Sequence, residues 1–496
     1  MPAVARPVVD GAGDAAVQAA SSARERKPWP RPTRRPVSRT TNEDTIAAIA
    51  TPLGEGGIGI VRLSGPDSIA ITQSIFVSAR GKDLRSSPGR VFYGEIHDAS
   101  GPVDEVLVHV MRAPHTYTRE DVVEINCHGG VVPLQTVLEL LLAKGARLAQ
   151  PGEFTKRAFL NGRIDLVQAE SVLDRIQART GAALRAAASA SHGVLSQAIY
   201  AFHDTLADAL ARIESAIDFP EEDLPELVDE ALRAQLATTL ASMQELLATA
   251  KAGRLYREGA SIAIAGRPNV GKSSLFNALL RDARAIVTAH PGTTRDLLEE
   301  VITLNGIPAR LSDTAGLRAT DDEVERLGIE TARRALSTAD VVIFLLDAAV
   351  EPSHEDETLA EEVLALGVPT VLAFNKIDVN PSPAAPFWAT RFSAVAEVSA
   401  KTGQGLHALE DTLHRLLLGE ALAFSPSQGL ITRVHQRDSL RRAIDALERL
   451  LANYDASPEF LSIELRDALD ALGEITGDTT PEDILDRIFS SFCIGK

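Results

Sequence analysis

The chain is short of cysteine, of long apolar runs and of basic charge. Its 496 residues include only two cysteines, Cys127 and Cys493, which excludes a disulfide framework and a zinc site built from four thiolates. No run of about eighteen apolar residues occurs and the N-terminus lacks an apolar signal core, so we predict neither a membrane span nor secretion. The formal net charge of -18 excludes a broadly basic coat, so any RNA contact must be focal. These features predict a cytoplasmic protein.

Large apolar side chains are also scarce at the N-terminus. Residues 1–40 are rich in alanine, proline and arginine, so they cannot bury enough surface to offset the entropy of ordering, and we expect a disordered tail. From 41 to 161, short apolar runs alternate with glycine, which is typical of a small α/β domain. We expect its strands at 45–50, 58–63, 91–96, 105–111 and 122–126, and a helix at 134–144.

Two later segments have a helical pattern. Residues 162–257 contain apolar side chains at steps of three and four, namely Leu206, Leu210, Ile213 and Ile217, and residues 424–496 contain similar stripes. Each stripe needs cover, so we expect the two segments to bury their apolar faces against each other. The intervening residues 258–423 would then be a P-loop domain inserted into a helical domain. The predicted fold class is multi-domain, α/β plus all-α.

A glycine-bounded loop organises the inserted domain. Residues 266–273 (Gly-Arg-Pro-Asn-Val-Gly-Lys-Ser) follow an apolar strand-like run and precede a helix-like run at 274–280. This is the context of a P-loop, in which backbone N–H groups surround a β-phosphate. Lys272 would add a positive charge at the phosphates, and Ser273 would give an oxygen to Mg²⁺.

Three further motifs follow, at 292–296 (Gly-Thr-Thr-Arg-Asp), 313–316 (Asp-Thr-Ala-Gly) and 375–378 (Asn-Lys-Ile-Asp). In this order and spacing they resemble the motif set of Ras-like GTPases. Asp378 can accept hydrogen bonds from N1–H and the 2-amino group of guanine, which favours GTP over ATP. The resemblance implies Mg²⁺ ligands at Ser273 and Thr294. It also implies a GTP-binding set of Asn269, Val270, Gly271, Lys272, Ser273, Ser274, Thr288, Ala289, His290, Pro291, Gly292, Thr293, Thr294, Asp313, Thr314, Ala315, Gly316, Asn375, Lys376, Asp378, Ser399, Ala400 and Lys401.

One position departs from the Ras-like pattern. Leu317 stands where Ras-type enzymes carry the glutamine that orients the attacking water, and no motif places an arginine finger. Because leucine cannot orient water, another polar residue must do so. Another cation must also stabilise the charge that develops on the γ-phosphoryl group.

Three separated stretches extend the resemblance to 41–496. They are 51–62 (Thr-Pro-Leu-Gly-Glu-Gly-Gly-Ile-Gly-Ile-Val-Arg), 151–161 (Pro-Gly-Glu-Phe-Thr-Lys-Arg-Ala-Phe-Leu-Asn) and 489–496 (Phe-Ser-Ser-Phe-Cys-Ile-Gly-Lys). With the GTPase motifs they resemble the MnmE, or TrmE, family of tRNA uridine-modification GTPases. The resemblance implies a homodimer that joins the FAD-dependent MnmG protein in a heterotetramer. This assembly would add a carboxymethylaminomethyl-type group to carbon 5 of the wobble uridine U34, using GTP and a 5,10-methylene or 5-formyl tetrahydrofolate.

The family resemblance also implies residues for the missing functions. Potassium would replace the arginine finger, with ligands at Asn269, Thr288, His290 and Thr293. Glu325 and Lys272 would be the catalytic residues, with Glu325 orienting the attacking water. Glu323 has the same chemistry as Glu325. The alternative is that these acidic residues only form the solvated start of a helix.

The implied folate site comprises Arg62, Glu124, Arg163 and Lys496. A carboxylate can pair with the amide and amino edge of a pterin, and cations suit the glutamate tail of folate. Ordinary surface salt bridges are the alternative interpretation of these charges. Cys493 is as well explained by packing as by function, so it is left out of the catalytic set.

Two rival functions remain open from the sequence. The first is a ribosome-assembly or signalling GTPase without one-carbon chemistry. The second is a scaffold that nucleotide merely stabilises, which the set of Lys272, Ser273, Thr294 and Asp313 disfavours.

Overall fold

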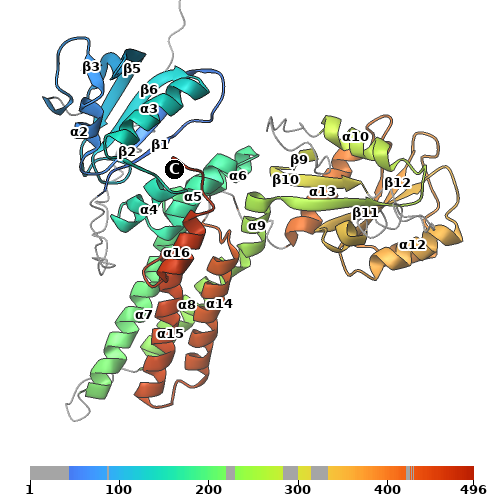
Figure 1. Cartoon of the computed structure of the whole chain (residues 1–496). Helices are drawn as coiled ribbons and strands as arrows, with labels where there is room; N and C mark the ends of the chain where they lie inside the picture. The colour runs from blue at the N-terminus through green and yellow to red at the C-terminus, as the bar shows by residue number, and fades with distance from the viewer. Residues whose placement is uncertain are drawn as a thin grey trace, which may run out of the picture. The chain divides into compact units, whose positions relative to one another are not determined.

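The computed structural model describes residues 44–496, except for 87–88, 219–228, 283–299, 314–332, 420–424, 426 and 428. The tail predicted over residues 1–40 lies outside this part of the chain. Along the described residues, an N-terminal sheet with helices precedes a group of helices, a second sheet and a further group of helices (Figure 1).

The N-terminal sheet has seven strands in the order β3-β4-β5-β6-β2-β1-β7. All neighbouring strands are antiparallel except β1 and β7. The elements are β1 (Ile46–Ile49), β2 (Gly56–Ser64), α2 (Ser68–Gln73), β3 (Phe76–Ser78), η1 (Leu84–Ser86), β4 (Val91–Asp98), β5 (Gly101–Met111), β6 (Val122–Gly129), α3 (Val131–Ala143), β7 (Arg147–Leu148) and α4 (Glu153–Leu160). Each expected strand and the expected helix are present, with ends shifted by a few residues.

Burial alternates along the strands of this sheet. On β4, Phe92 and Ile96 are buried, whereas Val91 and Tyr93 are more than half exposed. The buried face of the sheet packs against α3 through Leu134, Val137 and Leu141. Side chains with a period of two therefore give the sheet one covered face and one open face.

The helical part is formed by two segments that are distant in sequence. Its elements are α5 (Leu166–Gln177), α6 (Gly181–Ser191), α7 (Val194–Asp218), α8 (Glu230–Ala248), α9 (Ala250–Glu258), α14 (Val434–Ala452), α15 (Pro458–Thr476) and α16 (Glu482–Phe489). Leu206 and Ile213 of α7 share one buried cluster with Leu447 of α14 and Leu472 of α15. The prediction that the two segments cover each other's apolar stripes is confirmed.

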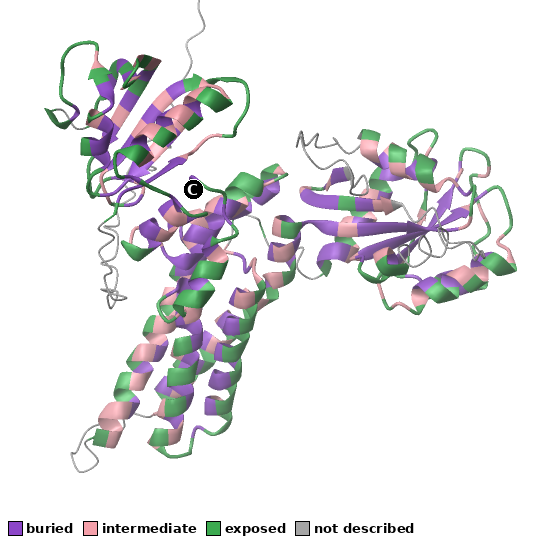
Figure 2. Cartoon of the chain, viewed as in Figure 1, coloured by how far each residue is buried: buried purple, intermediate pink, exposed green. Residues whose placement is uncertain are grey.

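The second sheet has the order β13-β12-β11-β8-β10-β9, in which only β9 is antiparallel to its neighbour. Its elements are β8 (Ala260–Ala265), α10 (Lys272–Asp282), β9 (Glu300–Leu304), β10 (Ile307–Asp313), β11 (Val341–Asp347), α12 (His354–Leu364), β12 (Thr370–Asn375), η2 (Phe387–Arg391), β13 (Ala394–Glu397) and α13 (Leu406–Leu418). The central strand β11 is apolar and buried along nearly its whole length, as Figure 2 shows in purple. Helices on both faces explain this burial, because two clusters flank the sheet.

The chain leaves the helical part and returns to it at neighbouring points. Gly253 in α9 lies so close to Ile431 that an added Cβ would be 2.0 Å from the Ile431 carbonyl oxygen. The Ile431 N–H donates to Thr249 Oγ1 at 3.0 Å. The second sheet is thus an insertion between two segments that touch each other.

Candidate functional site

The P-loop connects β8 to α10. Asn269 and Gly271 have φ angles of 67° and 100°, so the backbone turns through left-handed conformations before the helix begins at Lys272. Lys272 Nζ donates to the carbonyl oxygens of Gly266 at 2.7 Å and Arg267 at 2.9 Å. The loop therefore places an ammonium group and the N-terminus of α10 together, and both favour an anion.

Asn375, at the end of β12, joins the P-loop to the loop predicted to recognise the base. Its Nδ2 donates to the carbonyl oxygen of Val270 at 2.9 Å, and its Oδ1 accepts from the N–H of Ala400 at 3.0 Å. Nearby, Asp378 Oδ1 accepts from the Ser399 hydroxyl at 2.7 Å. The bracing role predicted for Asn375 and the placement of Asp378 beside the 399–401 loop agree with a site for guanine.

Lys376 adds a second link between the two motifs. Its Nζ donates to Asn269 O at 3.1 Å and forms an ion pair with Asp347 Oδ2 at 2.6 Å. A cleft of about 1040 Å³ runs between the motifs. Its lining includes Gly271, Ser274, Asn277, Asn375, Lys376, Asp378, Ala400 and Lys401. Residues from the phosphate and base motifs thus line one cleft large enough for a nucleotide.

Several predicted site residues lie outside the described residues. They are Thr288, Ala289, His290, Pro291, Gly292, Thr293, Thr294, Thr314, Ala315, Gly316 and Glu325. Asp313 ends β10 opposite Ile264 of β8, two residues before the P-loop begins at Gly266. The Mg²⁺ and K⁺ ligand sets and the role of Glu325 stay predictions.

The four residues of the implied folate site come from distant parts of the chain. Arg62 on β2 lies directly opposite Glu124 on β6. Both Nε and Nη2 of Arg62 contact Glu124 Oε1, at 2.8 and 2.7 Å. Arg62 Nη1 also donates to the carbonyl oxygen of Gly495, beside Lys496, at 3.3 Å. A salt bridge between Arg62 and Glu124 is present, as the alternative interpretation expects. It is not an isolated surface pair, because the C-terminal segment also contacts Arg62.

Lys496 and Arg163 complete this cluster. Burial, which is the largest effect, and the charge of Arg62 lower the pKa of Lys496 from its ordinary value, while Glu124 partly opposes the shift. Arg163 lies over the ring of Tyr117, with Cζ 4.7 Å from the ring centroid, and Arg62 Cζ is 6.0 Å from the same ring. The structure therefore brings three cations and one carboxylate together.

Two family models match the chain. The model of the GTP-binding protein TrmE N-terminus matches residues 45–163, and the model of the MnmE helical domain matches residues 166–493. The chain belongs to the MnmE family. The tRNA modification GTPase MnmE of Geotalea uraniireducens is 46% identical over 464 residues, covering 92% of this chain and 99% of that protein. MnmE of Chloroflexus aurantiacus is 48% identical over 460 residues, covering 91% and 100%.

Solved GTPase domains are also similar to part of the chain. The G domain of the T. maritima FeoB iron transporter is 28% identical, covers 32% of this chain and 98% of its own, and has a TM-score of 0.25. No helix within the described ranges is long and apolar enough to cross a membrane. The relatives are named tRNA modification GTPases, so membership of the MnmE family disfavours both rival functions.

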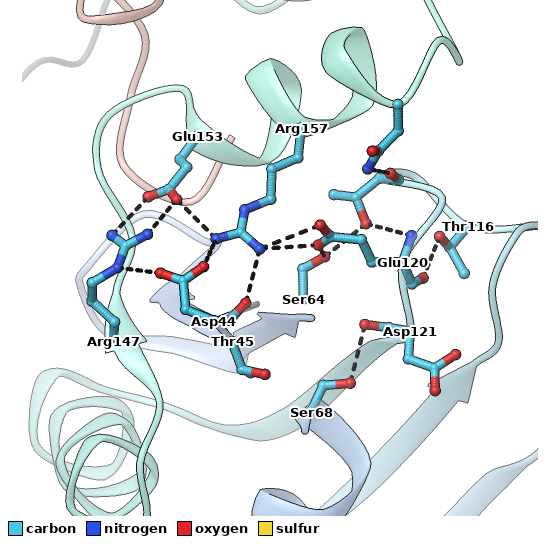
Figure 3. A network of polar contacts seen from close by, with 12 residues as sticks. Asp44, Thr45, Ser64, Ser68, Thr116, Glu120, Asp121, Arg147, Glu153 and Arg157 are labelled. Atoms are coloured by element: carbon cyan, nitrogen blue, oxygen red, sulfur yellow. Dashed lines mark hydrogen bonds and ion pairs between the residues drawn. The ribbon is translucent and has the colours of Figure 1, made fainter. Parts of the chain in front are cut away.

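Sequence reasoning missed the aromatic and ionic surroundings of the folate candidates in this MnmE-family chain. Arg157 on α4 is fully buried, and it forms ion pairs with Asp44, Glu120 and Glu153 at 2.7, 3.2 and 3.0 Å (Figure 3). Arg147 pairs with Asp44 and Glu153 at the edge of the same network. Arg157 and Glu153 lie in the 151–161 stretch quoted for the family resemblance, which was the signal available in the sequence.

This network also affects the titration of its carboxylates. Burial would raise the pKa of Glu153, but hydrogen bonds from Arg147, from the Gln150 N–H and from Arg157 outweigh it and hold that pKa below its ordinary value. The pKa of Asp44 is lowered in the same way by Arg147 and Arg157, against a desolvation effect. Both acids therefore stay ionised at neutral pH, as the buried Arg157 requires.

Proposed function

We propose that this chain is a tRNA modification GTPase that adds a carboxymethylaminomethyl-type group to carbon 5 of the wobble uridine U34 of certain tRNAs. It would do so with an FAD-dependent partner protein of the MnmG type. The observation that carries the proposal is that Arg62, Glu124 and the C-terminal Lys496 meet in one cluster, in a domain that a ribosome-assembly or signalling GTPase does not require.

The GTP-binding part of the proposal follows from the cleft. The backbone N–H groups of the P-loop and Lys272 would bind the phosphates, and Asp378 would accept from the guanine edge. Ser273 and Asn269 offer the oxygen donors that Mg²⁺ and K⁺ prefer, and these ions would supply positive charge at the phosphates. Glu325 would orient the attacking water, because Leu317 cannot.

The folate part of the proposal follows from the cluster of charges. Nε and Nη2 of Arg62 bind Glu124 Oε1, and within the described residues no donor to Oε2 is seen, so Oε2 can accept from the amide and amino edge of a pterin. Arg163 and Lys496 would attract the glutamate tail. A bound tetrahydrofolate derivative would supply the one-carbon unit.

We further propose a cytoplasmic homodimer. Support comes from the open face of the N-terminal sheet, where Val77, Val91, Tyr93 and Leu107 are each 45–58% exposed. Neighbouring apolar side chains of this kind are typical of a surface that another protein covers. Light scattering of the purified chain would measure the dimer directly, and a monomer at micromolar concentration would contradict it.

The function is tested by mass spectrometry of wobble uridines in cells that lack the gene. We expect the wild-type gene to restore the modified base and Glu124→Gln to fail, with GTP turnover within a few-fold of wild type. Glu258→Gln is the matched control, because this carboxylate ends α9 and pairs with Arg257 instead of Arg62. If the wobble uridine stays unmodified in cells that carry the wild-type gene again, the proposed activity is contradicted.

The cation dependence gives a separate prediction. If K⁺ takes the place of an arginine finger, hydrolysis should be faster in KCl than in NaCl at equal ionic strength by about tenfold or more, since such a finger contributes roughly 10³-fold or greater. Asn269→Ala should abolish the difference while GTP still binds. Asn305→Ala is the control, because Asn305 also has a left-handed φ, of 47°, and bonds Asp411 on α13. Equal wild-type rates in the two salts would exclude the potassium mechanism.

A further inference from the structure

Tyr117 lies at the centre of the candidate folate site, although no sequence motif pointed to it. The Arg163 guanidinium is 4.7 Å from the centre of its ring, and the Arg62 guanidinium is 6.0 Å from it. Arg62 is also 5.7 Å from the ring of Phe154, which is fully buried. One ring therefore contacts two cations that would otherwise repel each other.

The position of Tyr117 is fixed by its neighbours. Its hydroxyl group hydrogen-bonds Thr155 Oγ1 on α4 at 2.9 Å, and Thr155 is fully buried. Arg157, two residues after Thr155 on α4, forms an ion pair with Glu120, which lies three residues after Tyr117. The loop that carries Tyr117 and the helix that holds its hydroxyl are thus joined by the buried ion network in Figure 3.

A second set of bonds fixes the same loop from the sheet side. Ser64, at the end of β2, hydrogen-bonds the Thr118 hydroxyl at 2.7 Å and Glu120 Oε2 at 2.6 Å. The Thr116 hydroxyl donates to the Glu120 carbonyl oxygen at 2.6 Å. Residues on both sides of Tyr117 are therefore anchored, so its ring has little freedom to move away from the two arginines.

We propose that Tyr117 is a positioning residue of the folate site, which holds Arg163 and Arg62 in place through its ring face. This inference rests on the proposed folate function. The physical reason is that an aromatic face attracts guanidinium groups, and the attraction is larger where water is partly excluded. Glu124 pairs with Arg62, and the ring further lowers the cost of gathering Arg62, Arg163 and Lys496, whose charges an anionic ligand can then use.

The proposal separates the ring of Tyr117 from its hydroxyl group. Tyr117→Phe keeps the ring and loses the Thr155 bond, so folate affinity should stay within about threefold of wild type, as expected for one neutral hydrogen bond. Tyr117→Leu removes the ring, and affinity should fall roughly tenfold, the size of a partly desolvated cation–π contact. Tyr454→Leu is the matched control, because it removes a ring that another arginine, Arg233, contacts at 5.5 Å in the helical part, and it should bind folate as wild type does.

A double-mutant cycle tests whether Tyr117 acts through Arg163. The probe is 5-formyltetrahydrofolate, titrated calorimetrically into the full-length chain, with thermal unfolding measured for each variant. We expect Tyr117→Leu to add less than about twofold to the loss already caused by Arg163→Met, because Arg163 is the nearer of the two guanidiniums at the ring, at 4.7 Å against 6.0 Å for Arg62. Should Tyr117→Leu fail to fold, Tyr117→Met, whose unbranched and flexible side chain can adapt to the site of the ring, takes its place.

Two outcomes would overturn the inference. One is wild-type affinity in the folded Tyr117→Leu variant. The other is an undiminished tenfold loss in the Arg163→Met background, which would make the ring an independent contact. Failure of the wild-type chain itself to bind the probe is a different result, since it would remove the proposed folate function instead of the role of Tyr117.

Discussion

The nucleotide cleft and the folate candidate cluster are built in opposite ways. In the cleft, each motif follows the carboxyl end of a strand, so the P-loop after β8 and Asn375 at the end of β12 are placed by parallel neighbours of one sheet. In the cluster, Arg62 reaches the carbonyl oxygen of Gly495, which is 433 residues away. The first site depends on local loops, and the second depends on long-range contacts.

The two sites should therefore respond differently to mutation. A change within the cleft should alter nucleotide recognition and leave the rest of the fold intact. A change in the ion network behind the cluster should weaken the N-terminal domain as a whole, because that network connects the segment before β1, the loop before β6 and α4.

The largest effect is expected from Arg157→Met. Arg157→Met takes the cation from Glu120 and leaves Asp44 and Glu153 with Arg147 alone among the described residues, and loss of one partner from a buried ion pair typically costs about 3–5 kcal/mol of unfolding free energy. Arg147→Met is the control, since that side chain is 44% exposed, and it should cost no more than about 1 kcal/mol. Urea unfolding followed by a probe in the N-terminal domain measures both. Equal losses in the two variants would contradict the structural role of Arg157.

The same network predicts a pH dependence. The folded-state pKa values of Asp44 and Glu153 are lowered, so these groups contribute stability above their ordinary values near 4, and this contribution is lost as the pH falls through the folded-state values. In Arg157→Met the loss of stability on acidification should be smaller than in wild type. If the unfolding free energy of Arg157→Met falls with acidification as steeply as that of wild type, Arg157 does not set these pKa values.

A smaller effect, confined to the cleft, is expected from Asp378→Asn. The amide can donate to the extra carbonyl of xanthine, so preference should move from GTP toward XTP by roughly a hundredfold or more. Asp347→Asn is the control, because Asp347 pairs with Lys376 and does not read the base. Folate affinity should stay unchanged in both variants. A wild-type ratio of GTP to XTP affinity would remove Asp378 from base recognition.

The smallest effect is expected from Gly271→Ala. An added Cβ would lie 2.3 Å from Asn375 Nδ2 at a φ of 100°, so the amide that braces the P-loop must move. GTP affinity should fall about tenfold, as for the loss of one buried hydrogen bond. Gly367→Ala is the control, because its φ is 70° but nothing lies within 4 Å of the added atom. Its nucleotide affinity should be unchanged when measured by fluorescence titration.

The contrast also explains how much could be predicted from the sequence. The strand–loop–helix around Lys272 and the position of Asn375 follow from local pattern, because parallel strands place their ends at one edge of a sheet. The apolar stripes of α7 and α14 likewise predicted their common core. The pairing of Arg62 with the C-terminal segment came only from family resemblance, since no local pattern specifies a contact across the chain.

Tyr117 and Arg157 mark the limit of that prediction. A lone tyrosine between polar residues has no period or spacing that would distinguish it, and its role depends on two arginines brought to it by other segments. From the sequence, Arg157 in its eight-residue helix is expected to be an ordinary exposed cation. Its burial can be explained only when its three acidic partners are known.

The insertion between α9 and α14 has a consequence for synthesis on the ribosome. Helix α7 packs on α15, and α8 packs on α14, but about 175 residues separate the end of α9 from the start of α14 and take roughly 9–35 s to translate at the usual rate. During that delay the apolar stripes of α7 and α8 have no permanent cover, while the inserted sheet can already close on itself. The nascent chain should therefore be a client of holding chaperones in that interval, and release from them should coincide with the emergence of α15.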